Sequence, residues 1–137
     1  MPRSTEHVAW FEFEDLCEAA LGAAEYLSLT RRYHTVFVHN VPRFVISRNR
    51  NEMRRFITFV DVAYENHVKL FVAAAAPPMA LYVPDPQPGS SKGAAVFAGE
   101  EEHFAFDRTV SRLIEMQSEA YLQRHASAHQ PQPVEQV

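Results

Sequence analysis

Four arginines stand in two pairs whose types and spacing are suited to an anionic partner. Arg108 and Arg112 are four residues apart, so on a helix they lie one turn apart and project the same way. Arg54 and Arg55 are adjacent in a segment with helical periodicity. A guanidinium group can donate two parallel hydrogen bonds to a phosphate or a carboxylate. The arginines of both pairs are therefore candidates for phosphate contacts, with ion pairs as the alternative interpretation.

For Arg108 and Arg112, ion pairs with carboxylates of their own helix are the simpler interpretation. Arg112 has Glu115 and Glu119 ahead of it on the same predicted helix. A pair with either carboxylate would leave Arg108 facing solvent. Such pairs would make both arginines surface residues with no part in a site.

Arg54 and Arg55 have the same two interpretations. Because they are adjacent, one of them must point away from the apolar face of its helix. An ion pair with Asp61 or Glu52 is the structural interpretation. A phosphate contact or a subunit interface is the functional one, since arginines are dense over residues 48–55 and would form a basic surface for an acidic partner.

Metal and thiol chemistry are not favoured by the remaining reactive side chains. Four histidines, His34, His39, His67 and His103, have no spacing that resembles a ligand set, so the sequence predicts no metal site. Cys17 stands alone among apolar residues and is predicted to be a small buried side chain rather than a nucleophile.

The string G-x-x-x-x-G-K-[ST], which cradles nucleotide phosphates, does not occur in the 137 residues. Residues 89–93, GSSKG, have some of its composition, but Ser91 stands where a glycine would be needed. An acidic pair that could hold magnesium does not follow an apolar strand either, because His39 and Asn40 occupy that place. We expect no ATP binding and no catalysis by this chain alone.

Length and composition indicate one globular domain of modest size, since 47% of the residues are apolar and 22% are charged. The net charge of −4 argues against a nucleic-acid partner. The longest uncharged stretch, 70–84, contains two prolines and is too short for a transmembrane segment. Acidic residues interrupt the first 15 positions, which is unlike a secretory signal.

The first half of the chain is predicted to form alternating strands and helices. Residues 8–13 predict a strand and 14–20 a brief helix, which Gly22 is placed to stop in a left-handed conformation. A helix over 23–32 and a strand over 33–39 follow.

The next segments predict a strand–helix–strand unit. Apolar residues at i, i+3, i+4, i+7 and i+11 from Met53 indicate a helix over 47–66. The apolar run 68–76 does not alternate, which is typical of a strand buried on both faces. The fold class is therefore α/β, a small parallel sheet with flanking helices.

The last third is predicted to begin with a mobile surface loop over 77–102, rich in proline, glycine and serine. A short strand over 103–106 precedes a helix that Asp107 caps and that ends near residue 124. Its inner face would carry Val110, Leu113 and Ile114, among others. The domain spans 1–126, and 127–137 form a disordered tail.

Several stretches over about residues 11–122, in this order and spacing, resemble the C-terminal half of the AFG/ZapE-like ATPases, an AAA-type P-loop family. They are 13–17 (FEDLC), 21–27 (LGAAEYL), 33–36 (YHTV), 51–57 (NEMRRFI) and 104–118 (FAFDRTVSRLIEMQS). Two positions depart from the family pattern. Glu25 replaces an aspartate, and Ala73 with Ala74 replaces Ser-Ala.

The resemblance implies the C-terminal part of a P-loop NTPase fold whose full-length relatives bind ATP and Mg²⁺. In such enzymes Arg108, Arg112, Arg54 and Arg55 would contact a nucleotide in a site completed elsewhere. Relatives are linked to mitochondrial protein quality control or bacterial cell division, so we expect a mitochondrial location or, alternatively, the bacterial cytoplasm. Partners would be other ATPase subunits or substrate proteins. The alternative is a stand-alone, non-catalytic interaction module.

Overall fold

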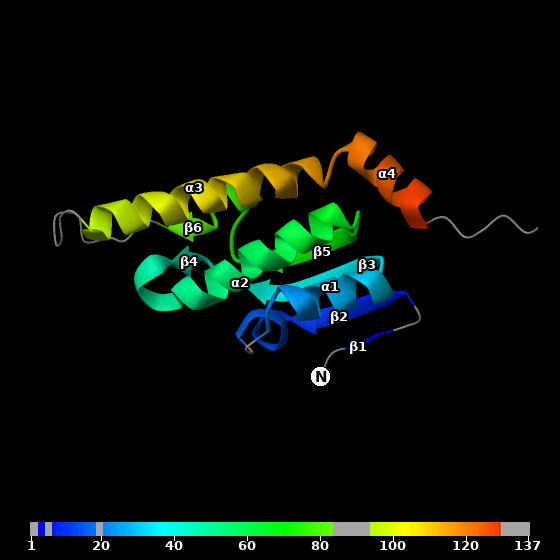
Figure 1. Ribbon diagram of the computed structural model, residues 1–137, viewed down its shortest axis with the longest axis horizontal. Helices are drawn as coiled ribbons and strands as arrows, with labels where there is room; N and C mark the ends of the chain where they lie inside the picture. Colours follow the sequence, from blue (N-terminus) through cyan, green and yellow to red (C-terminus); the bar gives the residue numbers. More distant parts are fainter. Residues whose placement is uncertain (1–2, 5–6, 19–20, 84–93, 130–137) are drawn as a thin grey trace, which may run out of the picture.

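The computed structural model describes residues 3–4, 7–18, 21–83 and 94–129 (Figure 1). The strands are β1 (Arg3–Ser4), β2 (Val8–Glu12), β3 (Thr35–Val41), β4 (Phe44–Val45), β5 (Lys69–Ala74) and β6 (Tyr82–Val83). The helices are α1 (Ala23–Arg32), α2 (Ile46–Glu65), α3 (Ala94–Glu115) and α4 (Glu119–His129). A π-helical turn, η1 (Glu14–Glu18), and a 3-10 turn, η2 (Pro78–Ala80), complete the described elements.

A four-stranded sheet in the order β1-β2-β3-β5 is the centre of the fold. Strands β2, β3 and β5 are parallel, and β1 is antiparallel to β2. Helix α1 connects β2 to β3, and α2 connects β3 to β5, so two strand–helix–strand units share β3. This confirms the predicted fold class, a small parallel sheet with flanking helices.

The core lies between one face of this sheet and the helices. Val36 and Val38 of β3 are fully buried in the same apolar cluster as Met53, Phe56 and Val60 of α2. The predicted apolar stripe of α2 is therefore confirmed at these three positions. Helix α3 packs beside α2 (Figure 1) and adds Phe106 and Leu113 to the same cluster, which Met116 joins directly after the end of α3; each is at most 7% exposed.

Gly22 begins a helix rather than ending one, which corrects the predicted left-handed stop. Its φ of −136° is extended, and it is the N-cap of α1. The Gly22 N–H donates to Oε1 of Glu25 at 2.8 Å. A carboxylate three residues into a helix satisfies the N-cap amide in this way, which gives the acidic residue at position 25 a structural role.

Strand β5 differs from its prediction because it is the last strand of the described sheet. An apolar run without alternation suggested burial on both faces, yet Phe71, Ala73 and Ala74 are exposed. A central strand needs a neighbour on each side, and among the described strands β5 has only β3.

Helix α3 begins well before its predicted start. The expected strand 103–106 and the expected cap Asp107 both lie inside α3, which contradicts these two predictions. The predicted helix also divides in two, since residues 116–118 separate α3 from α4. Ile114 was expected on the inner face but is 48% exposed, whereas Leu113 of α3 and Met116, directly after the helix, are buried.

The segment 77–102 is not an irregular loop throughout. It contains η2, β6 and the start of α3, and β6 pairs in parallel with β4. Residues 84–93, where mobility was predicted, lie outside the described residues, as do 130–137 of the predicted tail. Residues 127–129 belong to α4. In the parts of the chain that the structure describes, every helix falls short of the length and apolar character of a membrane span.

Candidate functional site

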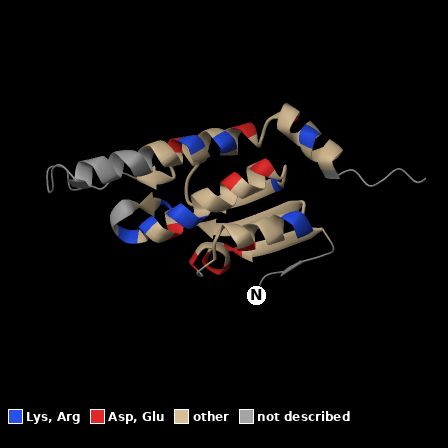
Figure 2. Cartoon of the chain, in the orientation of Figure 1, with Lys and Arg blue, Asp and Glu red and all other residues tan. Residues whose placement is uncertain are grey.

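The four candidate arginines lie on two helices that pack against each other, Arg54 and Arg55 on α2 and Arg108 and Arg112 on α3. Along the second half of α3 the two basic residues lie between two acidic ones, Asp107 and Glu115 (Figure 2). Arg54 and Arg108 are exposed, whereas Arg55 and Arg112 are partly buried. The two partly buried arginines have different surroundings.

Arg112 bridges α3 and α2. Its Nη1 forms an ion pair with Oδ1 of Asp61, and its guanidinium carbon lies 5.0 Å from the centre of the Tyr64 ring. The side chain of Arg112 remains 26% exposed. The predicted partners Glu115 and Glu119 are therefore replaced by a carboxylate from another helix. This geometry fixes the guanidinium while part of it stays open to solvent.

Arg55 points to the other end of the fold. Its Nη1 donates to the backbone carbonyl of Cys17 at 3.1 Å and, at 3.5 Å, to that of Glu18. These residues form the end of η1, whose last carbonyls have no partner further along a helix. The predicted ion pair with Asp61 is not formed, because that carboxylate binds Arg112. Arg55 therefore anchors η1 to α2.

Arg124, which was not predicted from the sequence as a site residue, is linked to Arg112 through the Tyr64 side chain. Nη2 of Arg124 on α4 donates to Oε2 of Glu115 at 3.0 Å, and the Tyr64 hydroxyl donates to the same oxygen at 2.8 Å. The Arg124 guanidinium also lies 5.7 Å from the centre of the Tyr121 ring. We call Asp61, Tyr64, Arg112, Glu115, Tyr121 and Arg124 the arginine–tyrosine cluster.

Tyr121 fixes this cluster to the sheet. Its hydroxyl is buried and donates to the backbone carbonyl of Val68 at 2.6 Å, just before β5. Its ring stacks with Tyr64 at 5.9 Å between centres. Burial raises the pKa of Tyr121, and the hydrogen bond to Glu115 raises the pKa of Tyr64. Both phenols therefore stay protonated at neutral pH and act as hydrogen-bond donors.

A polar cavity with a volume of about 400 Å³ lies beside the cluster, between α2, α3 and α4. Its lining consists of Tyr64, Glu65, His67, Glu115, Tyr121 and Arg124, so Asp61 and Arg112 lie outside it. Arg124 is the one arginine of this lining, and the Glu65 and Glu115 carboxylates outweigh its positive charge. Chemically, such a site can hold an anion only through guanidinium donors that the carboxylates do not already use.

The other reactive side chains do not assemble a second site. Burial raises the pKa of Cys17 to about 12, and the side chain is fully buried, so the predicted role as an apolar packing residue is confirmed. The rings of His7 and His34 stack at 5.2 Å, and His125 meets His34 edge-on at 5.5 Å. Within the described residues, no three metal-binding side chains form a group that could hold an ion.

Sequence reasoning missed Asp61, Tyr64, Tyr121 and Arg124 as members of one cluster. Asp61 and Tyr64 lie three residues apart on α2, which is the spacing of one helix face. That spacing was the only available signal, because their partners on α3 and α4 follow more than fifty residues later.

Comparison with known proteins identifies the family. A sequence model of the family described as AFG1-like ATPase matches residues 1–125. An uncharacterized protein of Schizosaccharomyces pombe is 36% identical over 135 residues, which cover 89% of this chain and 30% of the relative. Lactation elevated protein 1 homolog B of Danio rerio is 35% identical over 138 residues, covering 88% of this chain and 27% of the relative.

The cell division protein ZapE of Escherichia coli is 42% identical over 113 residues, covering 82% of this chain and 26% of the relative. The chain thus spans under a third of the length of these curated relatives. No solved structure matches it. Since the family model covers nearly the whole chain, this protein belongs to the family of AFG1-like ATPases.

Proposed function

We propose that this chain acts as the C-terminal part of an AFG1-like ATPase and contributes an arginine to a nucleotide site that residues outside the chain complete. One observation carries the proposal: the family match covers residues 1–125, while the string G-x-x-x-x-G-K-[ST] does not occur among the 137 residues. ATP and Mg²⁺ would then be ligands of the longer ATPase, held mainly by residues that this chain does not contain.

Arg112 is the arginine that the geometry favours for this role. Asp61 occupies Nη1, so the other guanidinium donors can bind a phosphate oxygen while the ion pair fixes the orientation. Arg108 lies one turn earlier on α3 and is exposed, which allows it to support the same contact. Arg54 is exposed on α2, and Arg55 is engaged by η1.

The chemistry needed at such a site is neutralisation of the charge that develops on the transferred phosphoryl group. An arginine does this well because its guanidinium remains charged and donates in a fixed plane. The expected partners are other ATPase subunits or substrate proteins. The biological setting would be protein quality control in the mitochondrion, or cell division in the bacterial cytoplasm as the name of ZapE indicates.

Turnover of Mg-ATP by the full-length E. coli relative tests the proposal. The residue of ZapE that aligns with Arg112 is replaced by alanine, and steady-state phosphate release is measured. We expect a loss of about 10³-fold if a guanidinium at that position meets the transferred phosphoryl group. The matched control is the residue that aligns with Arg55, whose replacement should change turnover far less. Unchanged turnover on loss of the Arg112 match would refute the assignment.

A non-catalytic interaction module is the second candidate, and exposed apolar side chains favour it. Met79 is 81% exposed and Phe104 is 64% exposed. Met79 lies on η2 and Phe104 on α3, two elements that pack against each other, and exposed apolar patches mark sites of protein contact. Sequencing of the gene upstream separates the candidates. An in-frame phosphate-binding loop would support the ATPase, and a stop codon in that frame would support the module.

A further inference from the structure

The outer edge of β5 is open in the described sheet. In the register with β3, the Lys69 N–H donates to the His34 carbonyl at 2.9 Å, and Phe71 pairs with Phe37. Because successive backbone groups of a strand point to opposite edges, the N–H and C=O of Leu70, Val72 and Ala74 point away from β3. Among the described strands none lies on that side.

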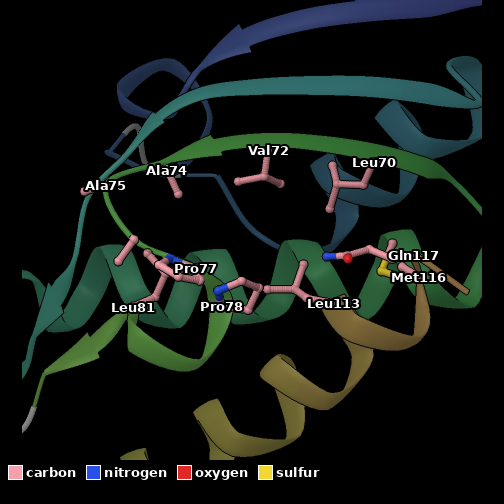
Figure 3. Close-up of a pocket in the computed structure, with 11 residues that line it drawn as sticks. Leu70, Val72, Ala74, Ala75, Pro77, Pro78, Leu81, Leu113, Met116 and Gln117 are labelled. Carbon is pink, nitrogen blue, oxygen red and sulfur yellow. The ribbon is translucent and has the colours of Figure 1, made fainter.

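Both faces of the sheet beside this edge are apolar and unfilled. On the helix side, a cavity with a volume of about 450 Å³ separates β5 from α3, lined by Leu70, Val72, Leu113 and Met116 among others (Figure 3). On the opposite side, Phe71 is 43% exposed. It is the last ring of a row that runs across three strands, Trp10, Phe37 and Phe71, with ring centres 5.2 and 4.5 Å apart.

These features fit the addition of a strand. A strand paired with β5 would point alternate side chains into the cavity and onto the free flank of Phe71. Exposed edges are normally protected by proline, by several charges or by a covering element. Within β5 only Lys69 is charged, and its ammonium lies 5.5 Å from the centre of the Phe71 ring.

The length of the relatives indicates what covers the edge. This chain spans only 26–30% of them, so most of the family polypeptide lies outside it. Parallel sheets are found almost only where both faces are covered by the rest of an α/β domain, whereas both faces beside β5 are partly open. We propose that the free edge of β5 is a strand-addition site that receives a strand from the region of an AFG1-like ATPase that this chain does not span.

This inference rests on the proposed function, because it assumes that the chain works against the rest of an ATPase. The test uses the full 137-residue chain with overlapping synthetic peptides that tile the part of E. coli ZapE outside the 113 matched residues. Amide hydrogen exchange is followed residue by residue. We expect at least one peptide to slow the outward amides of Leu70, Val72 and Ala74 about tenfold or more. The inward amides of Lys69 and Phe71 should keep their rates.

Two variants and one matched control make the result specific. Val72→Pro removes an outward N–H that β3 does not use, so the sheet of the chain should survive while peptide protection is lost. Phe71→Asp places a charge on the rim of the site and should have the same effect without changing a backbone group. His39→Asp adds the same charge on the same face of the central strand β3, where His39 is exposed, and should leave protection intact.

Several outcomes would overturn the proposal. They are the absence of protection by any peptide, equal protection in Phe71→Asp and His39→Asp, and outward amides already protected in a self-associating free chain. The last result, seen as a concentration-dependent sedimentation rate, would make a second copy the occupant. None of these measurements reads ATP turnover, so a failure here leaves the nucleotide proposal standing, and the reverse also holds.

Discussion

Arg112 is held by two weak contacts, an ion pair with Asp61 and the face of the Tyr64 ring. Both groups of the ion pair are partly exposed, so solvent screens their attraction. We predict that Arg112→Ala lowers the free energy of unfolding by about 1 kcal/mol, the sum of a screened pair and a cation–π contact. Urea denaturation measures this loss.

Arg108→Ala is the matched control on the same helix. Because Arg108 is exposed, its replacement should change the free energy of unfolding by less than about 0.5 kcal/mol. A loss of several kcal/mol for Arg112→Ala, or an equal loss for both variants, would mean that Arg112 is a structural residue and not a side chain available to a phosphate.

Tyr121 carries more of the stability than either arginine. Its buried hydroxyl donates to the carbonyl of Val68 at 2.6 Å, and Tyr121→Phe would leave that carbonyl without this donor. We predict a loss of about 1–3 kcal/mol in the free energy of unfolding. Tyr33→Phe is the control, because the Tyr33 hydroxyl is in an exposed hydrogen bond with Arg32. Equal losses in the two variants would contradict the role given to Tyr121.

Cys17 makes the free energy of unfolding depend on pH in the alkaline range. Burial raises its pKa from 9.0 to about 12, so the folded protein keeps a proton that the unfolded chain releases. The stabilisation is complete below pH 9 and is lost as the pH rises towards 12. We predict that the free energy of unfolding falls above pH 9 and that the fall is shallower in Cys17→Ala. An identical slope in the two proteins would contradict the predicted cause.

Single residues were predictable from the sequence only where their partners lie close along the chain. The burial of Cys17 was predicted from its apolar neighbours, whereas the contact of the Glu25 carboxylate with the Gly22 amide, one helical turn away, was not predicted. Arg112 and Asp61 are 51 positions apart, and Tyr121 and Val68 are 53 apart. Contacts of that kind depend on how α2, α3 and α4 pack, which no local pattern encodes.

Helix α3 provides an element-scale test of the packing. Phe106 is 1% exposed and contacts the rings of Phe44 and Tyr82, with centres 5.6 and 5.9 Å away. We predict that Phe106→Ala costs about 3–5 kcal/mol of unfolding free energy, because it leaves a cavity that rigid neighbours cannot fill. Ile114→Ala, at a half-exposed position of the same helix, should cost under about 1 kcal/mol. The reverse order, measured by urea denaturation, would show that the inner face of α3 is misassigned.

The same helix shows why some elements were predictable and others were not. The strand–helix–strand unit around α2 was predicted because α2 has a long apolar stripe and β3 is rich in β-branched residues, whereas the unit around α1 was not predicted as one. In α3 the alternation of Phe104 and Phe106 imitates a strand, and Asp107 imitates a cap. Its buried positions are Phe106, Thr109 and Leu113, a helical spacing that depends on the packing of α3 against α2.

At the scale of the whole molecule, the chain has a complete core but an incomplete sheet. The core cluster joins both strand–helix–strand units to α3 and α4, whereas β5 has β3 on one side and no second neighbour among the described strands. The sequence predicted β5 as a doubly buried strand because its residues are apolar without alternation. The relatives are longer, since this chain spans under a third of their length.

The central claim is that the chain belongs to an ATPase whose nucleotide site is completed elsewhere. Isothermal titration of the 137-residue chain with Mg-ATP tests it most directly. Exposed arginines without a phosphate-binding loop offer only contacts that salt screens. We predict no saturable heat of binding up to millimolar nucleotide at physiological ionic strength. A saturable heat of binding at micromolar affinity that is lost in Arg112→Ala would contradict the claim, because it would show that the chain holds a nucleotide site of its own.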